Sequence, residues 1–213
     1  MQMPSSQTAG GHTGCSPSQV RNDLFDRNKG FRLGKPRAVF ALWYFVKYVF
    51  FVSALPWPSR FKSWVLRSFG AEIGKGVYWK PRVSIHIPWN LKVGDYTWVG
   101  EEVCIINFAP IAVGAHCCLS QRCFLCSGNH DYRAENMAYR HAPIVLEDGV
   151  WVGAGAFVGP GVTVGTDAVI TAMSLVSHSV EGGMIYAGQP CKPVRRRWPE
   201  PARDPKPSRT SGA

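Results

Sequence analysis

The side chains best suited to proton transfer at neutral pH are the histidines, because imidazole titrates with a pKa of about 6.5. Two of them, His130 and His141, lie in the stretch 127–143, which reads S-G-N-H-D-Y-R-A-E-N-M-A-Y-R-H-A-P and follows no period. The remaining histidines are His12, His86, His116 and His178. A loop histidine alone is ordinarily a surface residue, so a catalytic role needs a motif around it.

The chain on either side of this stretch follows a six-residue period. From Val152 it reads V-G-A-G-A-F, V-G-P-G-V-T, V-G-T-D-A-V and I-T-A-M-S-L, with small residues at Ala156, Ala168 and Ser174. Such a period fits neither an α-helix nor a two-faced strand, and it is typical of a parallel β-helix in which each hexad supplies one short strand and one corner. The aliphatic residue of each hexad is expected to point to the axis.

The same period runs upstream with two slips, through Ile73, Val93, Val113 and Leu146. It predicts about five coils, since three hexads complete one coil. The period fails only between Leu125 and Leu146, and an irregular insert in a regular solenoid is more often functional than accidental. The fold class predicted is all-β, a parallel β-helix with a helical N-terminal cap.

The cysteines are predicted to be reduced core thiols. Their odd number and the lack of a cleavable signal peptide favour a reducing, cytosolic compartment. Cys117 and Cys123 occupy the small-residue position of their hexads, which gives them a packing role. Cys123 and Cys126 have C-x-x-C spacing, with histidines not far away, so zinc is the alternative. No second pair completes such a site, and no metal is expected.

Composition indicates one folded domain with an acidic partner. The chain has 213 residues, of which 46% are hydrophobic, and a net charge of +10. It shows no recognition-helix or aromatic-platform pattern, so nucleic acid is not the expected partner. The expected divisions are a disordered head (1–20), a cap or interfacial segment (21–70), the β-helix (71–198) with its loop (127–143), and a disordered tail (199–213).

The stretch 38–55 is almost wholly apolar and aromatic, with Lys47 as its one charge. Three interpretations remain open. It is slightly short for a transmembrane span, which needs about twenty apolar residues. It can cover the open end of the β-helix, which otherwise exposes an unpaired coil. It can also be an interfacial helix beside anionic lipid, flanked by arginines and lysines. The cap role and peripheral membrane contact are compatible, and both are expected. A second helix is predicted over 58–69.

Several segments together resemble a known family. They are V-G-D-Y-T-W-V-G-E-E-V, N-F-A-P-I-A-V-G, S-G-N-H-D-Y and A-P-I-V-L-E-D-G-V-W-V-G-A-G-A-F-V-G-P-G-V-T-V-G, preceded by L-P-W-P-S-R and F-G-A-E-I-G-K-G-V. They resemble the hexapeptide-repeat O-acetyltransferases, and within them the colanic-acid-type branch of exopolysaccharide acetyltransferases. The resemblance covers roughly 33–197. It implies a left-handed β-helix, an exception to the right-handed crossover rule, and a homotrimer with active sites between subunits.

The resemblance also implies roles for individual residues. His130, between Asn129 and Asp131, matches the catalytic histidine, whereas His141 is expected to be structural. Asp131, Glu102 or a backbone carbonyl would orient the imidazole. The residues implied along the acetyl-CoA groove are Trp151, Ala154, Ala172, Ser177, Lys192 and Arg195, the last two near the phosphates. Corner packing is the alternative for Trp151.

Three positions depart from the family pattern or leave a choice. Thr171 and Met173 replace glycines usual in the family, so the groove is expected to be narrower or shifted there. Asn107, Asp131 and Glu102 are the candidates for acceptor binding. The alternative for Asn107 is a corner asparagine with a stacked neighbour.

The function predicted is acetyl transfer from acetyl-CoA to a sugar hydroxyl of an exopolysaccharide or lipid-linked glycan precursor, with His130 as general base. The protein is expected in the cytoplasm, at or near the inner face of the membrane. Two alternatives are a zinc hydratase of the γ-carbonic-anhydrase kind and a non-catalytic hexapeptide scaffold. Metal analysis separates the first from the acetyltransferase, and CoA binding separates the second.

Overall fold

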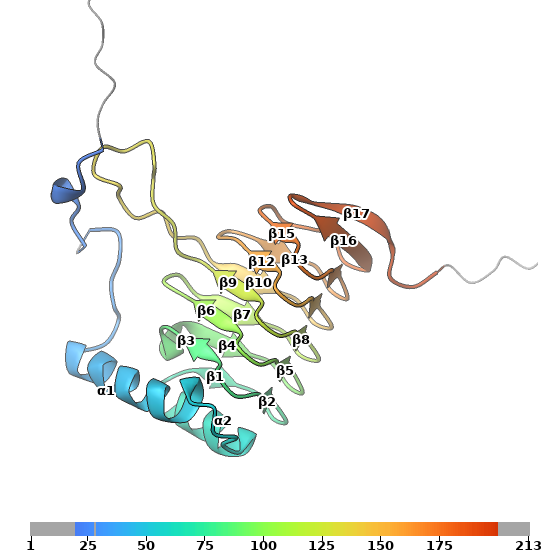
Figure 1. Cartoon of the computed structure of the whole chain (residues 1–213), viewed down its shortest axis with the longest axis horizontal. Coiled ribbons are helices and arrows are strands. Elements are labelled where there is room, and N and C mark those ends of the chain that lie inside the picture. The colour runs from blue at the N-terminus through green and yellow to red at the C-terminus, as the bar shows by residue number, and fades with distance from the viewer. Residues whose placement is uncertain (1–19, 28, 200–213) are drawn as a thin grey trace, which may run out of the picture.

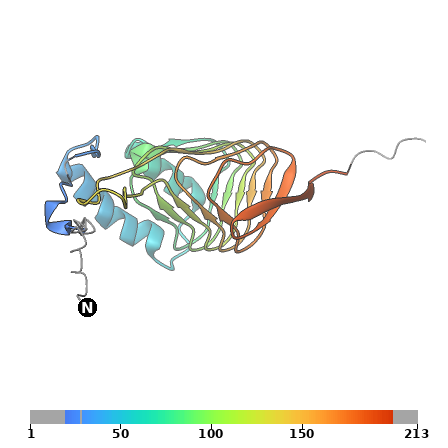
Figure 2. The same ribbon diagram turned by 90° about the horizontal axis from the view of Figure 1, so that it is seen from above.

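The computed structural model describes residues 20–27 and 29–199. Disorder was expected for 1–20 and 199–213. Apart from Val20 and Pro199, these residues lie outside the described ranges. Within them the chain is a left-handed parallel β-helix of triangular coils, covered by helices at its N-terminal end (Figures 1 and 2). The fold class predicted from the hexads is confirmed.

The strands of the described chain form three sheets, one on each side of the triangle. Sheet A holds β1 (Glu72–Ile73), β4 (Leu91–Val93), β7 (Ile111–Val113), β10 (Ile144–Leu146) and β13 (Thr163–Val164). Sheet B holds β2 (Tyr78–Trp79), β5 (Trp98–Val99), β8 (Cys118–Leu119), β11 (Trp151–Val152), β14 (Val169–Ile170), β16 (Met184–Gly188) and β17 (Cys191–Arg196). Sheet C holds β3 (Ser84–Ile85), β6 (Cys104–Ile106), β9 (Phe124–Cys126), β12 (Phe157–Val158) and β15 (Leu175–Val176).

The hexad pattern explains how the coils pack. The aliphatic residue of each strand points to the axis and is buried, as Leu119, Val152 and Ile170 illustrate on successive coils of sheet B. The glycine that follows allows the next coil to approach: a Cβ on Gly153 would lie 2.5 Å from the backbone nitrogen of Ala172. The corners therefore need either glycine or a small side chain, which is why the repeat is visible in the sequence.

The cysteines have the packing role predicted for them. Cys117 and Cys123 are buried, and burial raises the pKa of their thiols to about 11 and about 12. The Cys117 thiol donates to the carbonyl oxygen of Glu147 at 3.1 Å. Among the residues that the structure describes, none of the cysteines forms a disulfide.

Helix α1 (Arg37–Lys47) continues through a π-helical turn, η2 (Tyr48–Val52), and is followed by α2 (Ser59–Ser68). These helices cross the N-terminal end of the coils (Figure 1). Trp43 and Phe51 are fully buried against the first coils, and the Trp43 indole donates to the carbonyl oxygen of Ile85 at 3.2 Å. No helix within the described ranges is long and apolar enough to cross a bilayer.

A buried cation and histidine lie where α1 meets sheet C. Lys47 is almost fully buried, with its ammonium 4.1 Å from the centre of the Tyr44 ring, and burial lowers the pKa of Lys47. The hydroxyl of Tyr44 lies 3.2 Å from Nδ1 of His86. Burial, and then the charge of Lys47, lower the pKa of His86 from 6.5 to about 4. Both groups belong to the seam under α1.

The segment that precedes α1 lies against the loop 127–143, which leaves the coils between β9 and β10 (Figure 2). It contains a short 3-10 helix, η1 (Asn22–Leu24), and another, η3 (Pro88–Asn90), lies on the first coil. The backbone nitrogen of Arg21 donates to the carbonyl oxygen of Glu135 at 2.8 Å. Arg21, Phe25 and Phe31 thus contact the loop, a contact that the sequence did not predict.

Candidate active site

His130 is held in the loop 127–143 by its own backbone and by a backbone carbonyl. The backbone nitrogen of His130 donates to Oδ1 of Asn129 at 2.8 Å, and the backbone of His130 forms a β-bridge with that of Tyr139 across the loop. Its Nδ1 lies 2.6 Å from the carbonyl oxygen of Met137. A carbonyl oxygen has no proton to give, so Nδ1 must carry the proton and Nε2 keeps its lone pair. The imidazole is therefore arranged to accept a proton at Nε2.

An aromatic wall surrounds this imidazole. The Phe25 ring centre lies 5.5 Å from that of His130, and the Tyr139 ring centre lies 5.1 Å from it. Phe25 and Tyr139 also meet edge to face at 4.9 Å. Sequence reasoning missed Phe25, because nothing in an irregular N-terminal segment indicates which distant loop it contacts.

His141 packs against an aromatic ring in the same loop region. Its ring stacks on Phe108 at 5.0 Å with an interplanar angle of 10°. Its Nδ1 accepts from the backbone nitrogen of Asn129 at 3.2 Å, and its Nε2 is buried with no hydrogen-bond partner among the described residues. Burial, and then His130, lower the pKa of His141.

Asp131 and Glu102, the two carboxylates considered for orienting His130, are engaged elsewhere. Oδ1 of Asp131 accepts from the backbone nitrogen of Arg133 at 3.1 Å, which closes a local turn. Glu102 lies at another corner of the coil and accepts from Arg122 at 2.6 Å and from Arg82 at 3.0 Å. These ion pairs, that with Arg122 first, lower the pKa of the Glu102 carboxyl. Of the three orienting groups considered, the backbone carbonyl is the one that contacts the imidazole.

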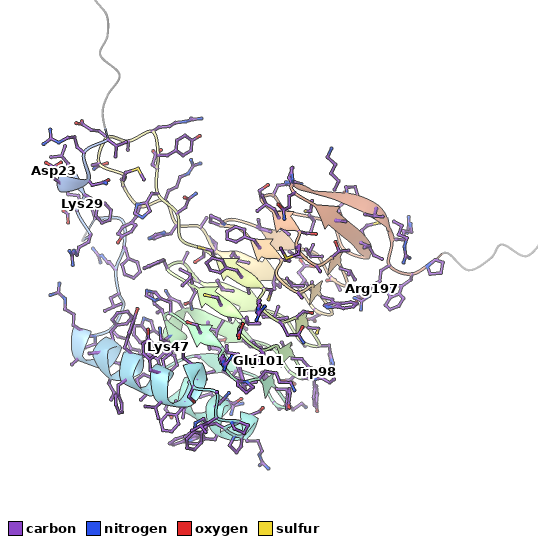
Figure 3. All side chains as sticks on the ribbon, in the orientation of Figure 1. Asp23, Lys29, Lys47, Trp98, Glu101 and Arg197 are labelled. Carbon is purple, nitrogen blue, oxygen red and sulfur yellow. The ribbon has the colours of Figure 1, made fainter. Side chains whose placement is uncertain are left out.

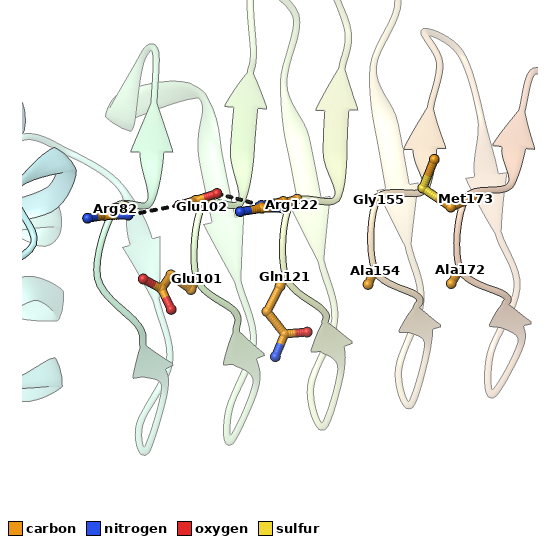
Figure 4. A pocket seen from close by; sticks show the side chains of 9 residues that line it. All are labelled: Arg82, Glu101, Glu102, Gln121, Arg122, Ala154, Gly155, Ala172 and Met173. Atoms are coloured by element: carbon orange, nitrogen blue, oxygen red, sulfur yellow. Dashed lines mark hydrogen bonds and ion pairs between the residues drawn. The ribbon is translucent and has the colours of Figure 1, made fainter.

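The corner between sheets B and C forms a groove of about 540 Å³ (Figure 4). One row of corner residues runs along it as Glu101, Gln121, Ala154 and Ala172, so that the side chains become small toward the C-terminal coils. Small residues leave the backbone amides open to a ligand that lies flat along the corner. Ala154 and Ala172, predicted along the acetyl-CoA groove, are thus brought together.

The second row of the groove consists of Arg82, Glu102, Arg122, Gly155 and Met173 (Figure 4). The non-glycine members adopt left-handed backbone conformations, with φ near 58°. The Met173 side chain occupies the space beside Gly155, since a Cβ there would lie 2.5 Å from its sulfur. Thr171 turns toward Ser174, with their hydroxyl oxygens 3.0 Å apart. Met173 therefore narrows the groove, whereas Thr171 faces the corner.

The other residues predicted for the cofactor do not line this groove, and they lie on sheet B, on β17 and at the corner between sheets C and A. Trp151 projects from β11 and is 47% exposed, and its indole donates to the hydroxyl of Ser120 at 2.9 Å. Ser177 follows β15 and is exposed. Lys192 and Arg195 are exposed on β17, the antiparallel strand beyond the last coil. The two cations thus lie at the C-terminal end of the β-helix.

Asn107 is not placed to bind an acceptor. Its side chain is fully buried, Oδ1 accepts from the backbone nitrogen of Ile87 at 2.8 Å, and Nδ2 donates to the carbonyl oxygen of Ile87 at 2.6 Å. Both ends of the amide are therefore used in joining two coils. These contacts are those of a corner asparagine, and they leave neither end of the amide for the acceptor binding expected of Asn107.

His130 and the groove occupy different corners of the same chain. His130 belongs to the loop between β9 and β10, which is the corner between sheets C and A, whereas Ala154 and Ala172 lie at the corner between sheets B and C. Sheet C separates the two corners. The loop with His130 and the groove therefore lie at opposite edges of one sheet.

No group of three His, Cys, Asp or Glu side chains in 20–27 or 29–199 is arranged to hold a metal ion. Within the described residues, Cys123 is fully buried and unavailable as a ligand. Cys123 has the small-residue position of the hexad that begins at Leu119, and Cys126 follows Leu125 in the next hexad.

Comparison with known proteins gives relatives of one kind. No family model matches the chain. A protein of Escherichia coli named as a candidate colanic acid biosynthesis acetyltransferase, WcaF, is 38% identical over 173 residues, which cover 81% of this chain and 94% of the relative. The galactoside O-acetyltransferase of Escherichia coli is 24% identical over 134 residues, covering 62% of this chain and 66% of the enzyme.

Solved structures share the fold. A hexapeptide-repeat acetyltransferase of Vibrio cholerae, also solved with acetyl-CoA, superimposes with a TM-score of 0.69 at 22% identity over 75% of this chain; the match covers 91% of the chain in the first structure and 87% in the complex. A galactoside acetyltransferase in complex with coenzyme A gives a TM-score of 0.68 at 21% identity, covering 75% of this chain and 81% of that one.

Proposed function

Because this chain belongs to the hexapeptide-repeat acetyltransferases, related to the colanic acid type, we propose that it transfers the acetyl group of acetyl-CoA to a sugar hydroxyl of an exopolysaccharide or lipid-linked glycan precursor. The observation that carries the catalytic part is the contact of His130 Nδ1 with the carbonyl oxygen of Met137. It leaves Nε2 as the proton acceptor. Membership of an acetyltransferase family favours this function over a zinc hydratase or a scaffold.

The groove fits acetyl-CoA in the features that the structure shows. Ala154 and Ala172 present only methyl groups, so pantetheine amides can approach the corner backbone. Lys192 and Arg195 lie beyond the last coil, where their charges would meet the adenosine phosphates. The cofactor would therefore run from the C-terminal end of the β-helix toward Gln121, with its thioester at the level of the loop.

The chemistry is a direct transfer. The sugar hydroxyl oxygen attacks the thioester carbonyl carbon while Nε2 of His130 takes the hydroxyl proton. A backbone amide of the groove would stabilise the negative oxygen of the tetrahedral intermediate. The carbon–sulfur bond then breaks, and the imidazolium returns the proton to the leaving thiolate. The products are a sugar ester and free CoA, with no acyl-enzyme.

The site is completed, on this proposal, by a second copy of the chain. Sheet C carries an outward row of apolar side chains, Cys104, Phe124, Phe157 and Leu175. Three copies arranged about an axis parallel to the β-helix, with sheet C facing that axis, bring the loop corner of one copy beside the groove corner of the next. His130 of one subunit would thus act on acetyl-CoA held by its neighbour in a homotrimer.

The cap would also contact a membrane. Leu42, Phe45 and Tyr48 are exposed on one side of α1 and its continuation, and Trp64 is exposed on α2. The sequence from Arg27 to Ala71 contains no acidic residue. Exposed aromatic side chains among cations suit the headgroup region of an anionic bilayer. A trimer would place its caps at one end, so that all face the same surface.

Kinetics of His130→Ala test the proposed reaction. Acetyl transfer is followed by release of the CoA thiol in the presence of sugar acceptors, and CoA affinity is measured by calorimetry. His130→Ala should lower kcat by about 10²–10⁴-fold with CoA affinity within a few-fold of wild type. His141→Ala should lower kcat far less than His130→Ala does. A wild-type protein that does not bind CoA, or a folded His141→Ala variant that is the more damaged of the two, would contradict the proposal.

A further inference from the structure

Sheet B carries a row of exposed aromatic side chains, of which only Trp151 was predicted to contact acetyl-CoA. The parallel register aligns Tyr78, Trp98, Cys118 and Trp151 on successive coils. Tyr78 is 46% exposed and Trp98 is 63% exposed. Trp98 lies on the side of the coils away from the loop 127–143 (Figure 3). A monomeric surface seldom keeps aligned aromatic rings exposed without a ligand or a partner.

The rings enclose two adjoining hollows because Cys118 is small. One hollow, of about 580 Å³, is lined by Tyr78, Lys80, Trp98, Ser120 and Gln121 among others. The next, of about 530 Å³, is lined by Trp98 and Trp151 with Tyr96, His116 and Arg197. Trp98 borders both, and their volumes lie in the range of small-molecule sites. The first hollow shares Gln121 with the groove at the corner between sheets B and C.

The chemistry of the first hollow suits a carbohydrate. A pyranose ring has one face of C–H groups that stacks on an aromatic ring, and hydroxyls at its edge that need hydrogen-bond partners. Ser120, Gln121 and Lys80 supply such partners, and no carboxylate lines this hollow. The bond from the Trp151 indole to Ser120 fixes the orientation of that ring. Lys80 adds a positive charge that would attract an acidic sugar.

The spacing indicates a chain of sugars rather than one sugar. Neighbouring coils are ~4.8 Å apart, so Trp98 and Trp151 are separated by ~10 Å. An oligosaccharide spans that distance and a monosaccharide does not. We propose that the face of sheet B formed by Tyr78, Trp98 and Trp151 binds a glycan chain. On the acetyl transfer proposed above, this chain is the acceptor, and it runs from the CoA groove toward the cap.

Binding of oligosaccharides of graded length tests the site. The probes are neutral cello-oligosaccharides and acidic oligogalacturonides, each from monomer to hexamer, followed by calorimetry and by tryptophan fluorescence. Wild-type affinity should rise with length, by about tenfold or more between monomer and tetramer. Trp98→Ala should abolish that rise and Trp98→Phe should retain most of it. Lys80→Met should weaken the acidic series more than the neutral series, because only the acidic series also loses an attractive charge. The matched control is Val145→Ala, at an exposed outward position on sheet A. It should leave the affinity for both series unchanged.

Three outcomes would overturn the inference. They are equal affinities in wild type and Trp98→Ala, no saturable binding of either series by wild type, and dissociation of the oligomer in Trp98→Ala by light scattering, which would make this face an interface between copies. Affinity for acetyl-CoA, measured in parallel, separates the two proposals. Length-dependent binding through Trp98 in a protein that does not bind acetyl-CoA would support the glycan site and refute the transferase.

Discussion

Nδ1 of His130 and the carbonyl oxygen of Met137 lie 2.6 Å apart, within one loop that leaves the β-helix between β9 and β10. The contact fixes both the tautomer and the direction of the imidazole, and it does so without a carboxylate. The Met137 carbonyl is a neutral partner, so it orients the ring without adding charge.

The first prediction concerns that tautomer. In the neutral imidazole of His130 the proton should reside on Nδ1, because the Met137 carbonyl oxygen can only accept. Heteronuclear NMR of the imidazole nitrogens measures this directly, with His178, which is exposed, as the internal comparison. A dominant Nε2-protonated form of His130 would show that the loop is held differently and that Nε2 is not the base.

The second prediction concerns pH and the seam under α1. The pKa of His86 is lowered to about 4, by burial first and then by Lys47. Between pH ~6.5 and ~4 the unfolded chain then binds more protons at this site than the folded one, so stability falls as pH falls through this window. Tyr44 and Lys47 are the titratable groups that face His86.

His86→Phe should therefore lose less stability than wild type on acidification from pH ~6.5 to ~4. The difference should reach at most about 2 kcal/mol once solvent screening is allowed for. Denaturant unfolding at several pH values measures it, and His178→Phe, at an exposed position, controls for loss of a histidine. Parallel pH curves for wild type and His86→Phe would show that His86 is protonated in the folded state.

Much of this structure could be predicted from the sequence, because hexad positions correspond to fixed places on a coil. Val152, Ala156 and Gly153 each have a role that the period alone defines, whereas the groove residues Ala154 and Ala172 were implied by the family resemblance. Asn107 could not be placed in this way: the same corner position can face a ligand or the next coil, and the sequence does not show the backbone of Ile87 that binds it. The contact of Phe25 with His130 joins two irregular segments, for which no period exists.

The third prediction concerns the phosphates of CoA. Lys192→Glu combined with Arg195→Glu should weaken acetyl-CoA by about tenfold or more and dephospho-CoA by less, since the lost charge-assisted contacts are to phosphate oxygens. Calorimetry with both ligands measures the difference. Lys75→Glu, on the first coil at the opposite end of the molecule, is the control. Equal weakening of the two ligands would place these cations away from the adenosine phosphates.

The fourth prediction concerns the cap. Wild-type protein should sediment with vesicles containing anionic phosphatidylserine and be released, at least in part, by salt. Phe45→Asp with Tyr48→Asp should reduce that binding by about tenfold or more, because both exposed rings are lost and like charge is added. Val145→Asp on sheet A is the control for an exposed apolar position. Undiminished binding by the double variant would exclude this face of α1, and absence of binding by wild type would leave α1 as a cap alone.

The most direct test of the account is complementation between two inactive chains. His130→Ala removes the base and Ala172→Trp fills the groove, so each variant alone should be inactive. If the base of one subunit serves the groove of the next, every mixed trimer contains one intact site. Random mixing in equal amounts then predicts about a quarter of wild-type acetyl transfer. Transfer no higher than that of the separate variants, in trimers shown to be mixed, would contradict a site shared between subunits.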